Sequence, residues 1–253
     1  MVNFTDQHVL ITGSSRGIGQ ATARAFAEAG ARVAVHYRKG ETAARKTLEG
    51  LPGDGHILVQ GDMAQPEDTQ RLIDTCVQDL GGLDILVNNA GVFLPHPIDE
   101  CSFVEWQKAW QDTLAINLTG AANLCYWAGQ YMMTQRRGRI INITSRGAFR
   151  GEPDHPAYGA SKAGLNALSQ SLALKLGPYG IGVYAIAPGF VETDMAKPVL
   201  EGPAGESIRR QSPLGRVAQA DEVAHAVLFY ASPQAAFLTG GILDVNGASY
   251  LRS

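Results

Sequence analysis

The sequence predicts a doubly wound α/β fold built on a seven-stranded, mostly parallel sheet. Short apolar, β-branched runs alternate with helical stretches along the chain, which is typical of consecutive βαβ units. The apolar runs are nearly continuous instead of alternating with polar residues, as parallel strands covered by helices on both faces require. No linker, repeat or low-complexity tract interrupts the pattern, so we expect residues 1–253 to form a single domain.

The predicted elements follow in order. Strands are expected where β-branched residues cluster, at 8–12, 33–35, 57–59, 84–87, 139–143, 182–186 and 241–245. Helices are expected at 18–29, where Ala21, Ala25 and Ala29 share one face, and at 67–79, 103–135, 157–176 and 220–231. The segment 188–213 is rich in proline and glycine and is predicted to be an irregular substrate lid, because such long loops in compact domains are usually functional.

Composition excludes several classes of function. The net charge of −3 provides no basic field, so neither a nucleic acid nor a membrane surface is expected as a partner. The cysteines at 76, 101 and 125 match no disulfide framework, and together with the scattered histidines they predict no metal site. The first residues lack the pattern of a signal peptide, and no apolar run approaches the ~20 residues that span a bilayer. A cytoplasmic location is expected.

A glycine-rich turn joins the first predicted strand to the first helix. Its glycines allow a tight turn and let backbone N–H groups approach a pyrophosphate, and the helix N-terminus adds positive partial charge. Alone, such a turn could be only a tight strand–helix connection, but its place after the first strand favours dinucleotide binding. We therefore expect a Rossmann-type three-layer fold whose turn holds a dinucleotide through Gly13, Ser15, Arg16, Gly17, Ile18 and Gly19.

Further motifs follow the later strands. Asn88-Asn89-Ala90-Gly91 ends the fourth, Ser145 ends the fifth, Tyr158 and Lys162 open the next helix, and Pro188-Gly189 ends the sixth. With the glycine-rich turn, this order and spacing resembles the short-chain dehydrogenase/reductase family, and is most similar to its 3-oxoacyl-acyl-carrier-protein reductase group. The resemblance covers essentially the whole chain. It implies an oxidoreductase that transfers hydride between a nicotinamide and a carbonyl or secondary alcohol.

The candidate catalytic residues are Asn117, Ser145, Tyr158 and Lys162. Tyr158 and Lys162 share a helix face, and a nearby ammonium is expected to lower the pKa of the phenol; the alternative is a chance pair on an amphipathic helix. Ser145 could hydrogen-bond a carbonyl oxygen or merely cap a turn, and no G-x-S-x-G elbow surrounds it. The resemblance gives Tyr158 the acid/base role, and Lys162 a contact with the nicotinamide ribose. It also implies that Asn117 interrupts its helix and holds a proton-relaying water on its carbonyl.

The resemblance also assigns cofactor contacts beyond the glycine-rich turn. It places Asp62 and Met63 near the adenine, although Asp62 could equally be a turn or helix-capping residue. It sets the backbone of Asn89, Ala90 and Gly91 against the adenosine ribose. The segment around the nicotinamide carboxamide matches Pro188, Gly189, Val191 and Thr193.

The second strand indicates which dinucleotide is bound. NAD sites usually place an acid at the end of this strand, whereas here it is followed by Arg38 and Lys39. Arg38 could grip a 2′-phosphate, with Arg16 approaching from the other side; the alternative is that these are solvated charges. NADP(H) is therefore expected to be favoured over NAD(H).

Three functions remain open. The first is reduction of a 3-oxoacyl thioester or similar ketone, the second is a sugar, polyol or small-alcohol dehydrogenase, and the third is a non-catalytic dinucleotide-sensing protein. The intact catalytic set argues against the third. Segment 176–179 lacks the basic residues that would meet an acidic carrier protein, although Arg136, Arg137 and Arg139 partly compensate. His155 could line the substrate pocket or lie in a surface loop.

Relatives in the family commonly assemble as tetramers, so the resemblance implies a homotetramer built on helices 103–135 and 157–176 and on the last strand. These helices carry more large apolar residues than one sheet face needs: Trp106, Trp110, Leu124, Tyr126 and Trp127.

Overall fold

A seven-stranded sheet lies at the centre of the computed structural model, which describes residues 3–252. Its strand order is β3-β2-β1-β4-β5-β6-β7, and every neighbouring pair is parallel. The strands are β1 (His8–Ile11), β2 (Arg32–Tyr37), β3 (Ile57–Gln60), β4 (Ile85–Asn88), β5 (Gly138–Ile143), β6 (Ile181–Pro188) and β7 (Ile242–Val245). The predicted doubly wound fold is confirmed. The order reverses between β1 and β4, and such a switch point opens a crevice at the carboxyl ends of the strands.

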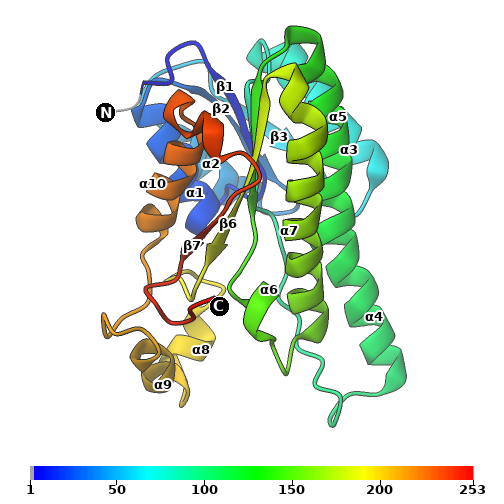
Figure 1. Cartoon of the computed structure of the whole chain (residues 1–253), viewed down its shortest axis with the longest axis vertical. Coiled ribbons are helices and arrows are strands. Elements are labelled where there is room, and N and C mark those ends of the chain that lie inside the picture. Colours follow the sequence, from blue (N-terminus) through cyan, green and yellow to red (C-terminus); the bar gives the residue numbers. More distant parts are fainter. Residues whose placement is uncertain (1–2, 253) are drawn as a thin grey trace.

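Helices cover both faces of the sheet (Figure 1). One layer holds α1 (Gly17–Glu28), α2 (Glu41–Glu49) and α10 (Ala220–Ala231). The other holds α3 (Pro66–Thr75), α4 (Phe103–Leu114), α5 (Ala121–Gln135) and α7 (Pro156–Leu176). The sequence pattern missed α2 because only Ala44 and Thr47 of this polar helix are buried.

Successive strand residues enter two separate cores. In β1, Val9 and Ile11 pack with the cluster that includes Phe26 of α1. Leu10 between them packs with the cluster that includes Leu124 of α5. Because both faces are covered, most residues of such a strand are apolar, which explains the nearly continuous apolar runs in the sequence; the buried polar exceptions, such as Asn88 and Asn142, are hydrogen-bonded.

The predicted helix 103–135 is divided. Between α4 and α5, residues Ala115–Gly120 form a π-helical segment that contains Asn117. The interruption at Asn117 that the resemblance implied is therefore present. A second π-helical segment, Cys76–Leu80, extends α3. Extra-residue turns of this kind inside helices occur frequently at functional sites.

The predicted lid is more regular than its composition indicated. It contains two short helices, α8 (Lys197–Glu201) and α9 (Gly205–Arg210), and Val191 forms a bridge with Ala218. In Figure 1 these helices lie below the sheet, at the end where β6 finishes. The short helix α6 (Gly147–Arg150) follows β5 at the same end.

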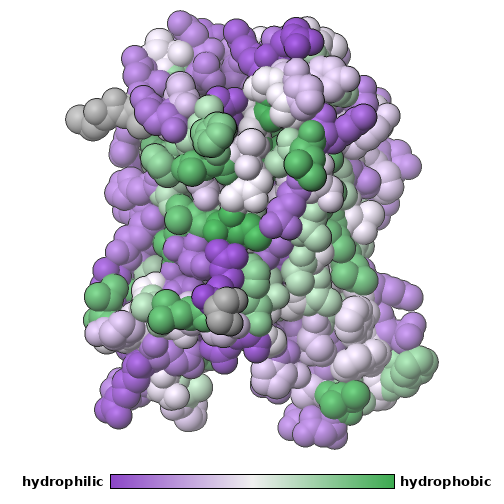
Figure 2. Space-filling model, viewed as in Figure 1, coloured by the Kyte–Doolittle hydropathy of each residue, from purple (hydrophilic) through white to green (hydrophobic). Residues whose placement is uncertain are grey.

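The surface carries exposed apolar side chains on α4, α5 and α7 and near the C-terminus. They include Phe103, Val104, Tyr126, Leu174 and Phe237. Leu124, which the sequence placed with this set, is instead fully buried inside the chain, because it faces β4 and β5 from α5. Figure 2 shows hydrophobic side chains gathered in the middle of the face that carries β7, with hydrophilic ones around its margin. None of the helices in residues 3–252 combines the length and apolar character needed to cross a membrane.

Candidate active site

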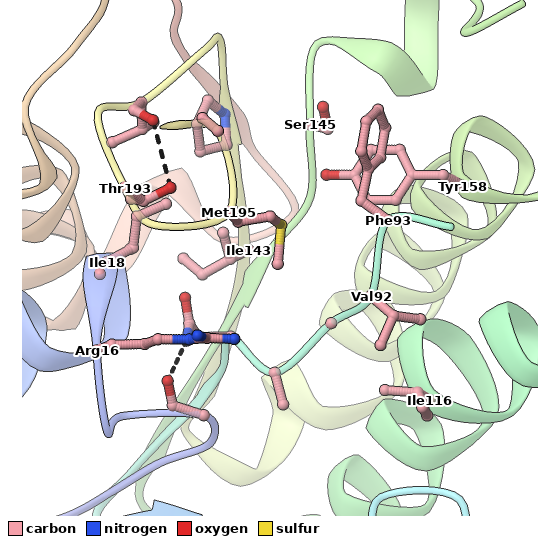
Figure 3. Close-up of a pocket in the computed structure, with 18 of the residues that line it drawn as sticks. Arg16, Ile18, Val92, Phe93, Ile116, Ile143, Ser145, Tyr158, Thr193 and Met195 are labelled. Carbon is pink, nitrogen blue, oxygen red and sulfur yellow. Dashed lines mark hydrogen bonds between the residues drawn. The ribbon is translucent and has the colours of Figure 1, made fainter. Parts of the chain in front are cut away.

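A cavity of about 400 Å³ opens at the carboxyl ends of the strands. Every residue that the sequence assigned to the cofactor or to catalysis lines it, except Gly19 and Asn117. In Figure 3, Arg16 and Ile18 lie on the α1 side of the cavity, Ser145 and Tyr158 lie on the opposite side, and Met195 reaches in between. The fold thus brings together residues that are more than a hundred positions apart in the chain.

The glycine-rich turn has the geometry that a phosphate group requires. Gly13 and Gly17 adopt φ of 63° and 58°, which side chains disfavour. A Cβ atom at Gly13 would lie 3.0 Å from the Cα atom of Ala90, so only glycine permits this close packing. No side chain caps the N-terminus of α1, and no acid lies in its first turn. Its N–H groups are therefore free to bind an anion, and the residues present fit a pyrophosphate.

Thr12 and Asn89 stabilise the glycine-rich turn through hydrogen bonds. The Oγ1 atom of Thr12 accepts hydrogen bonds from the backbone N–H groups of Asn89 and Ala90, both at 2.9 Å. The Nδ2 atom of Asn89 donates to the carbonyl of Thr12 at 2.8 Å. The sequence had assigned Asn89 only a backbone role, so its side-chain contribution to the turn is a finding of the structure.

His36 is a further support that the sequence did not identify. Its Nδ1 atom accepts the N–H of Gly13 at 2.9 Å, and its Nε2 atom donates to the carbonyl of Gly61 at 3.0 Å. Burial lowers the pKa of His36 from 6.5 to about 4, so the ring is neutral, as both bonds require. Its only sequence signal is its position in β2, on the same side of the strand as Ala34.

Arg38 and Asp62 meet at the end of the cavity nearest β2 and β3. The guanidinium of Arg38 is 46% exposed and lies 3.8 Å from a carboxylate oxygen of Asp62, which makes this a weak contact. Asp62 also accepts the N–H of Ala64 at 3.0 Å. Asp62 is therefore a turn residue that also lines the cavity, and its contact with the adenine stays a prediction. Lys39 is exposed and does not line the cavity.

Ser145, Tyr158 and Lys162 form the polar end of the cavity. The N–H of Gly147 donates to Oγ of Ser145 at 3.0 Å, and Nζ of Lys162 donates to the carbonyl of Ile143 at 2.8 Å. Burial lowers the pKa of Lys162 to about 8.

The expected lowering of the Tyr158 pKa is wrong for this structure. Burial raises that pKa to about 12, although the neighbouring Ser145 hydroxyl acts in the opposite direction. Lys162 does not offset this burial, because its ammonium lies 5.7 Å from the centre of the Tyr158 ring and donates to Ile143 instead.

Asn117 lies behind the cavity wall. Its Oδ1 atom accepts the N–H of Val92 at 2.8 Å, and its Nδ2 atom donates to the carbonyl of Val92 at 3.0 Å. A Cβ atom at Gly91 would lie 3.2 Å from this Oδ1 atom and 3.6 Å from Nζ of Lys162. Asn117 therefore fixes the loop that follows β4 beside Lys162. The water relay through its carbonyl stays a prediction.

The wall next to Tyr158 was not predicted residue by residue. The rings of Phe93 and Tyr158 meet edge to face with centroids 4.7 Å apart, and the His155 ring stacks on Phe93 with centroids 3.6 Å apart. His155 thus backs the wall and does not line the cavity. Arg146, Glu152, Phe190, Met195 and Val199 complete the lining. Nothing in the sequence pattern singled them out, because they lie on irregular segments.

Segment 176–179 does not lie at the cavity mouth, because it precedes β6 and the carbonyl of Pro178 accepts a hydrogen bond from Arg136. Arg136, Arg137 and Arg139 lie at that same end of the sheet and are not at the mouth either. They lie at the amino end of β5, whereas Ser145 follows its carboxyl end, and a six-residue strand spans about 20 Å. Arg137 is also engaged in an ion pair with Asp84 at 3.2 Å. Within residues 3–252, no group of His, Cys, Asp and Glu residues could hold a metal ion.

Comparisons with known proteins agree with this geometry. A family model described as enoyl-(acyl carrier protein) reductase matches residues 13–248. A 3-oxoacyl-[acyl-carrier-protein] reductase of Synechocystis is 37% identical over 250 residues, which cover 98% of each chain. The 3-oxoacyl-[acyl-carrier-protein] reductase FabG of Vibrio cholerae is 35% identical over 99% of this chain and 100% of its own.

Two solved structures share the fold. One is a short chain dehydrogenase from Burkholderia cenocepacia in complex with NADP, with a TM-score of 0.86 and 31% identity over 98% of this chain and 99% of its own. The other, from Brucella melitensis, is described as a ribose-5-phosphate isomerase and has a TM-score of 0.89 and 31% identity over 98% and 93% of the two chains.

Proposed function

The chain belongs to the short-chain dehydrogenase/reductase family, and we propose that it is an NADP(H)-dependent reductase of ketone carbonyls. The observation that carries the proposal is the placement of Ser145, Tyr158 and Lys162 in one cavity with a glycine-rich, uncapped helix N-terminus. This complete set favours hydride transfer over sugar isomerisation and over a non-catalytic nucleotide sensor.

The protonation state of Tyr158 supports reduction of a carbonyl. A phenol with a pKa of about 12 is protonated at neutral pH, so it carries the proton that a carbonyl oxygen needs. Oγ of Ser145 already accepts the N–H of Gly147, which leaves the hydroxyl proton to donate to the same carbonyl oxygen. When bound, the reduced nicotinamide supplies hydride to the carbonyl carbon. The carbon gains hydride and the oxygen gains the Tyr158 proton, which gives a secondary alcohol.

We assign the cofactor to the glycine-rich side of the cavity. The turn and the N-terminus of α1 would bind the pyrophosphate, and Arg38 with Arg16 would bind the 2′-phosphate of NADP. Asp62 and Met63 would lie at the adenine. Residues 89–91 would face the adenosine ribose, and the segment 188–193 the carboxamide. The ammonium of Lys162 donates one of its three protons to the carbonyl of Ile143, so the other two would be free to hydrogen-bond the nicotinamide ribose.

Two substrate classes are candidates. The names of the relatives support a 3-oxoacyl thioester. A hydroxylated ketone, of the sugar or polyol kind, is favoured by the carboxylate of Glu152 in the cavity wall. The names of the relatives also include an acyl carrier protein, but Arg136, Arg137 and Arg139 lie at the end of the sheet opposite the cavity and do not support a carrier at its mouth.

We also propose a lid, an oligomeric state and a cellular compartment for the protein. Segment 188–213 would be a lid over the substrate, because Phe190, Met195 and Val199 within it line the cavity. The exposed apolar residues of α4, α5 and α7 and Phe237 support a homotetramer with C2-related interfaces. The three cysteines are free thiols, which suits a reducing compartment such as the cytoplasm.

Replacing the acid tests the function. Tyr158→Phe removes one hydroxyl, so we expect NADPH binding to persist while turnover falls about a hundred- to ten-thousand-fold. NADPH oxidation would be followed with acetoacetyl-CoA, hydroxyacetone and butanone, and NADPH binding by fluorescence titration. Tyr131→Phe, on α5 outside the cavity, is the matched control. Near-normal turnover by Tyr158→Phe would remove Tyr158 from the mechanism.

A further inference from the structure

Glu152 places a carboxylate in the cavity wall next to the reacting groups. Its Oε1 atom lies 2.6 Å from where a Cβ atom of Gly147 would be, so the carboxylate packs directly against that glycine. The same Gly147 donates its N–H to Oγ of Ser145. Glu152 is also near enough to Tyr158 for its charge to raise the pKa of the phenol. The carboxylate thus stands beside the position of the substrate carbonyl.

This carboxylate lacks a hydrogen-bond donor. Among residues 3–252 no side chain or backbone group hydrogen-bonds or ion-pairs with it, although it is partly buried. Burial raises its pKa, and the charges of Arg150 and Arg146 oppose that shift. The carboxylate lines the cavity, so water can solvate it until a ligand fills the space. A ligand that displaces this water without supplying a donor leaves the acceptor unpaired, which costs about 1–3 kcal/mol, whereas a ligand with a hydroxyl there restores the hydrogen bond.

The two nearby arginines are committed elsewhere. Arg146 donates to Oγ of Ser249 and to Oε1 of Gln211, both at 2.6 Å, and Arg150 donates to the same Gln211 oxygen at 3.2 Å. They supply positive charge close to Glu152 without donating to it. The site therefore has no need of a cationic substrate, and the missing partner is a neutral donor such as a hydroxyl group.

We propose that Glu152 selects ketones that carry a hydroxyl group close to the carbonyl. The inference rests on the proposed carbonyl reduction at Ser145 and Tyr158 and specifies its substrate class. In the bound substrate, Ser145 and Tyr158 hold the carbonyl oxygen, and Glu152 accepts the hydrogen bond of the neighbouring hydroxyl. An unsubstituted acyl or alkyl chain in the same place would leave the carboxylate without a partner and would be disfavoured.

Hydroxyacetone and butanone test this directly, because they differ only by the exchange of a hydroxyl for a methyl group. We expect the wild-type kcat/KM with NADPH to be about ten- to a hundred-fold higher for hydroxyacetone. Glu152→Met, which keeps the length of the side chain and removes the acceptor, should bring the ratio close to one. Its activity on butanone should rise, because the unpartnered carboxylate is gone. A merely structural role for Glu152 would lower both activities together.

Asp154→Asn is the matched control. Asp154 is exposed and carries the same charge two residues away, but it does not line the cavity. The preference for hydroxyacetone should survive in this variant, and its loss there would assign the effect to general charge. Equal wild-type use of the two ketones, or reduction of acetoacetyl-CoA alone, would refute the role of Glu152 and leave carbonyl reduction standing. Reduction of none of the three substrates would overturn both proposals.

Discussion

Replacing Arg38 by aspartate tests the cofactor preference most directly. Arg38 is the first residue after β2 and lines the cavity, and its only ion-pair partner within residues 3–252 is Asp62 at 3.8 Å. That contact is too long and too exposed to hold the guanidinium in place. The side chain is therefore available to a 2′-phosphate, which it can bind through two parallel N–H groups.

The size of the effect follows from the exposure of the site. A hydrogen bond to a charged group contributes about 1.5–3 kcal/mol, and because Arg38 is 46% exposed the lower half of this range applies. We expect the wild type to favour NADPH over NADH about ten- to thirty-fold in kcat/KM. In Arg38→Asp the preference should disappear or reverse, because the new carboxylate repels the phosphate and accepts hydrogen bonds from the ribose hydroxyls.

The assay is kcat/KM for NADPH and NADH at fixed ionic strength. Lys39→Asp is the control, since it makes the same change of charge one residue further on, outside the cavity. A loss of preference of equal size in Lys39→Asp would mean that the general field, and not a phosphate contact, sets the choice. A wild type that uses NADH as well as NADPH would refute the reasoning altogether.

Three further outcomes are expected. His36 has a folded pKa of about 4 against 6.5 when unfolded, so its contribution of about 3 kcal/mol to stability is complete above pH 6.5 and is lost as the pH falls towards 4. In urea unfolding, the wild type should therefore lose about 3 kcal/mol more than His36→Asn over this pH range, because the carboxylates contribute equally to both. The lid 188–213 should gain hydrogen-exchange protection when NADPH and substrate bind, and unchanged protection would contradict its closure. Light scattering at micromolar concentration should give a tetramer, and a monomer would exclude that assembly.

The parts of the fold that the sequence predicts well are those set by local pattern. Strands buried on both faces need continuous apolar runs, so all seven could be located, as could α1, α7 and α10. Helix α2 was missed because it buries only two residues. The short helices α8 and α9 were missed because the prolines and glycines spread through residues 188–213 indicated a loop.

The residues of the candidate site also fall into those that local pattern predicts and those that it does not. Residues that directly follow a strand, such as Gly13, Arg38 and Ser145, could be placed at one edge of the sheet, because parallel strands all end there. His36 and Glu152 could not. The role of His36 depends on a contact with a turn 23 positions away in the chain. Glu152 lies on a loop whose path has no periodic signal. The pKa of Tyr158 also escaped prediction, because it depends on burial and on the direction in which Lys162 points.

The loop that carries Glu152 is positioned by distant parts of the chain, and this explains why substrate choice is harder to predict than chemistry. Arg146 ties the start of the loop to Gln211, just after α9, and to Ser249 near the C-terminus. Arg150 binds the same Gln211 oxygen. Movement of the segment around Gln211 would therefore displace the loop between Ser145 and Tyr158. Tyr158 lies on α7 and Ser145 follows β5, so regular elements place the groups that act on the carbonyl oxygen. Glu152, which we propose selects the substrate, lies on a loop held by hydrogen bonds from Arg146 to residues that are 65 and 103 positions away.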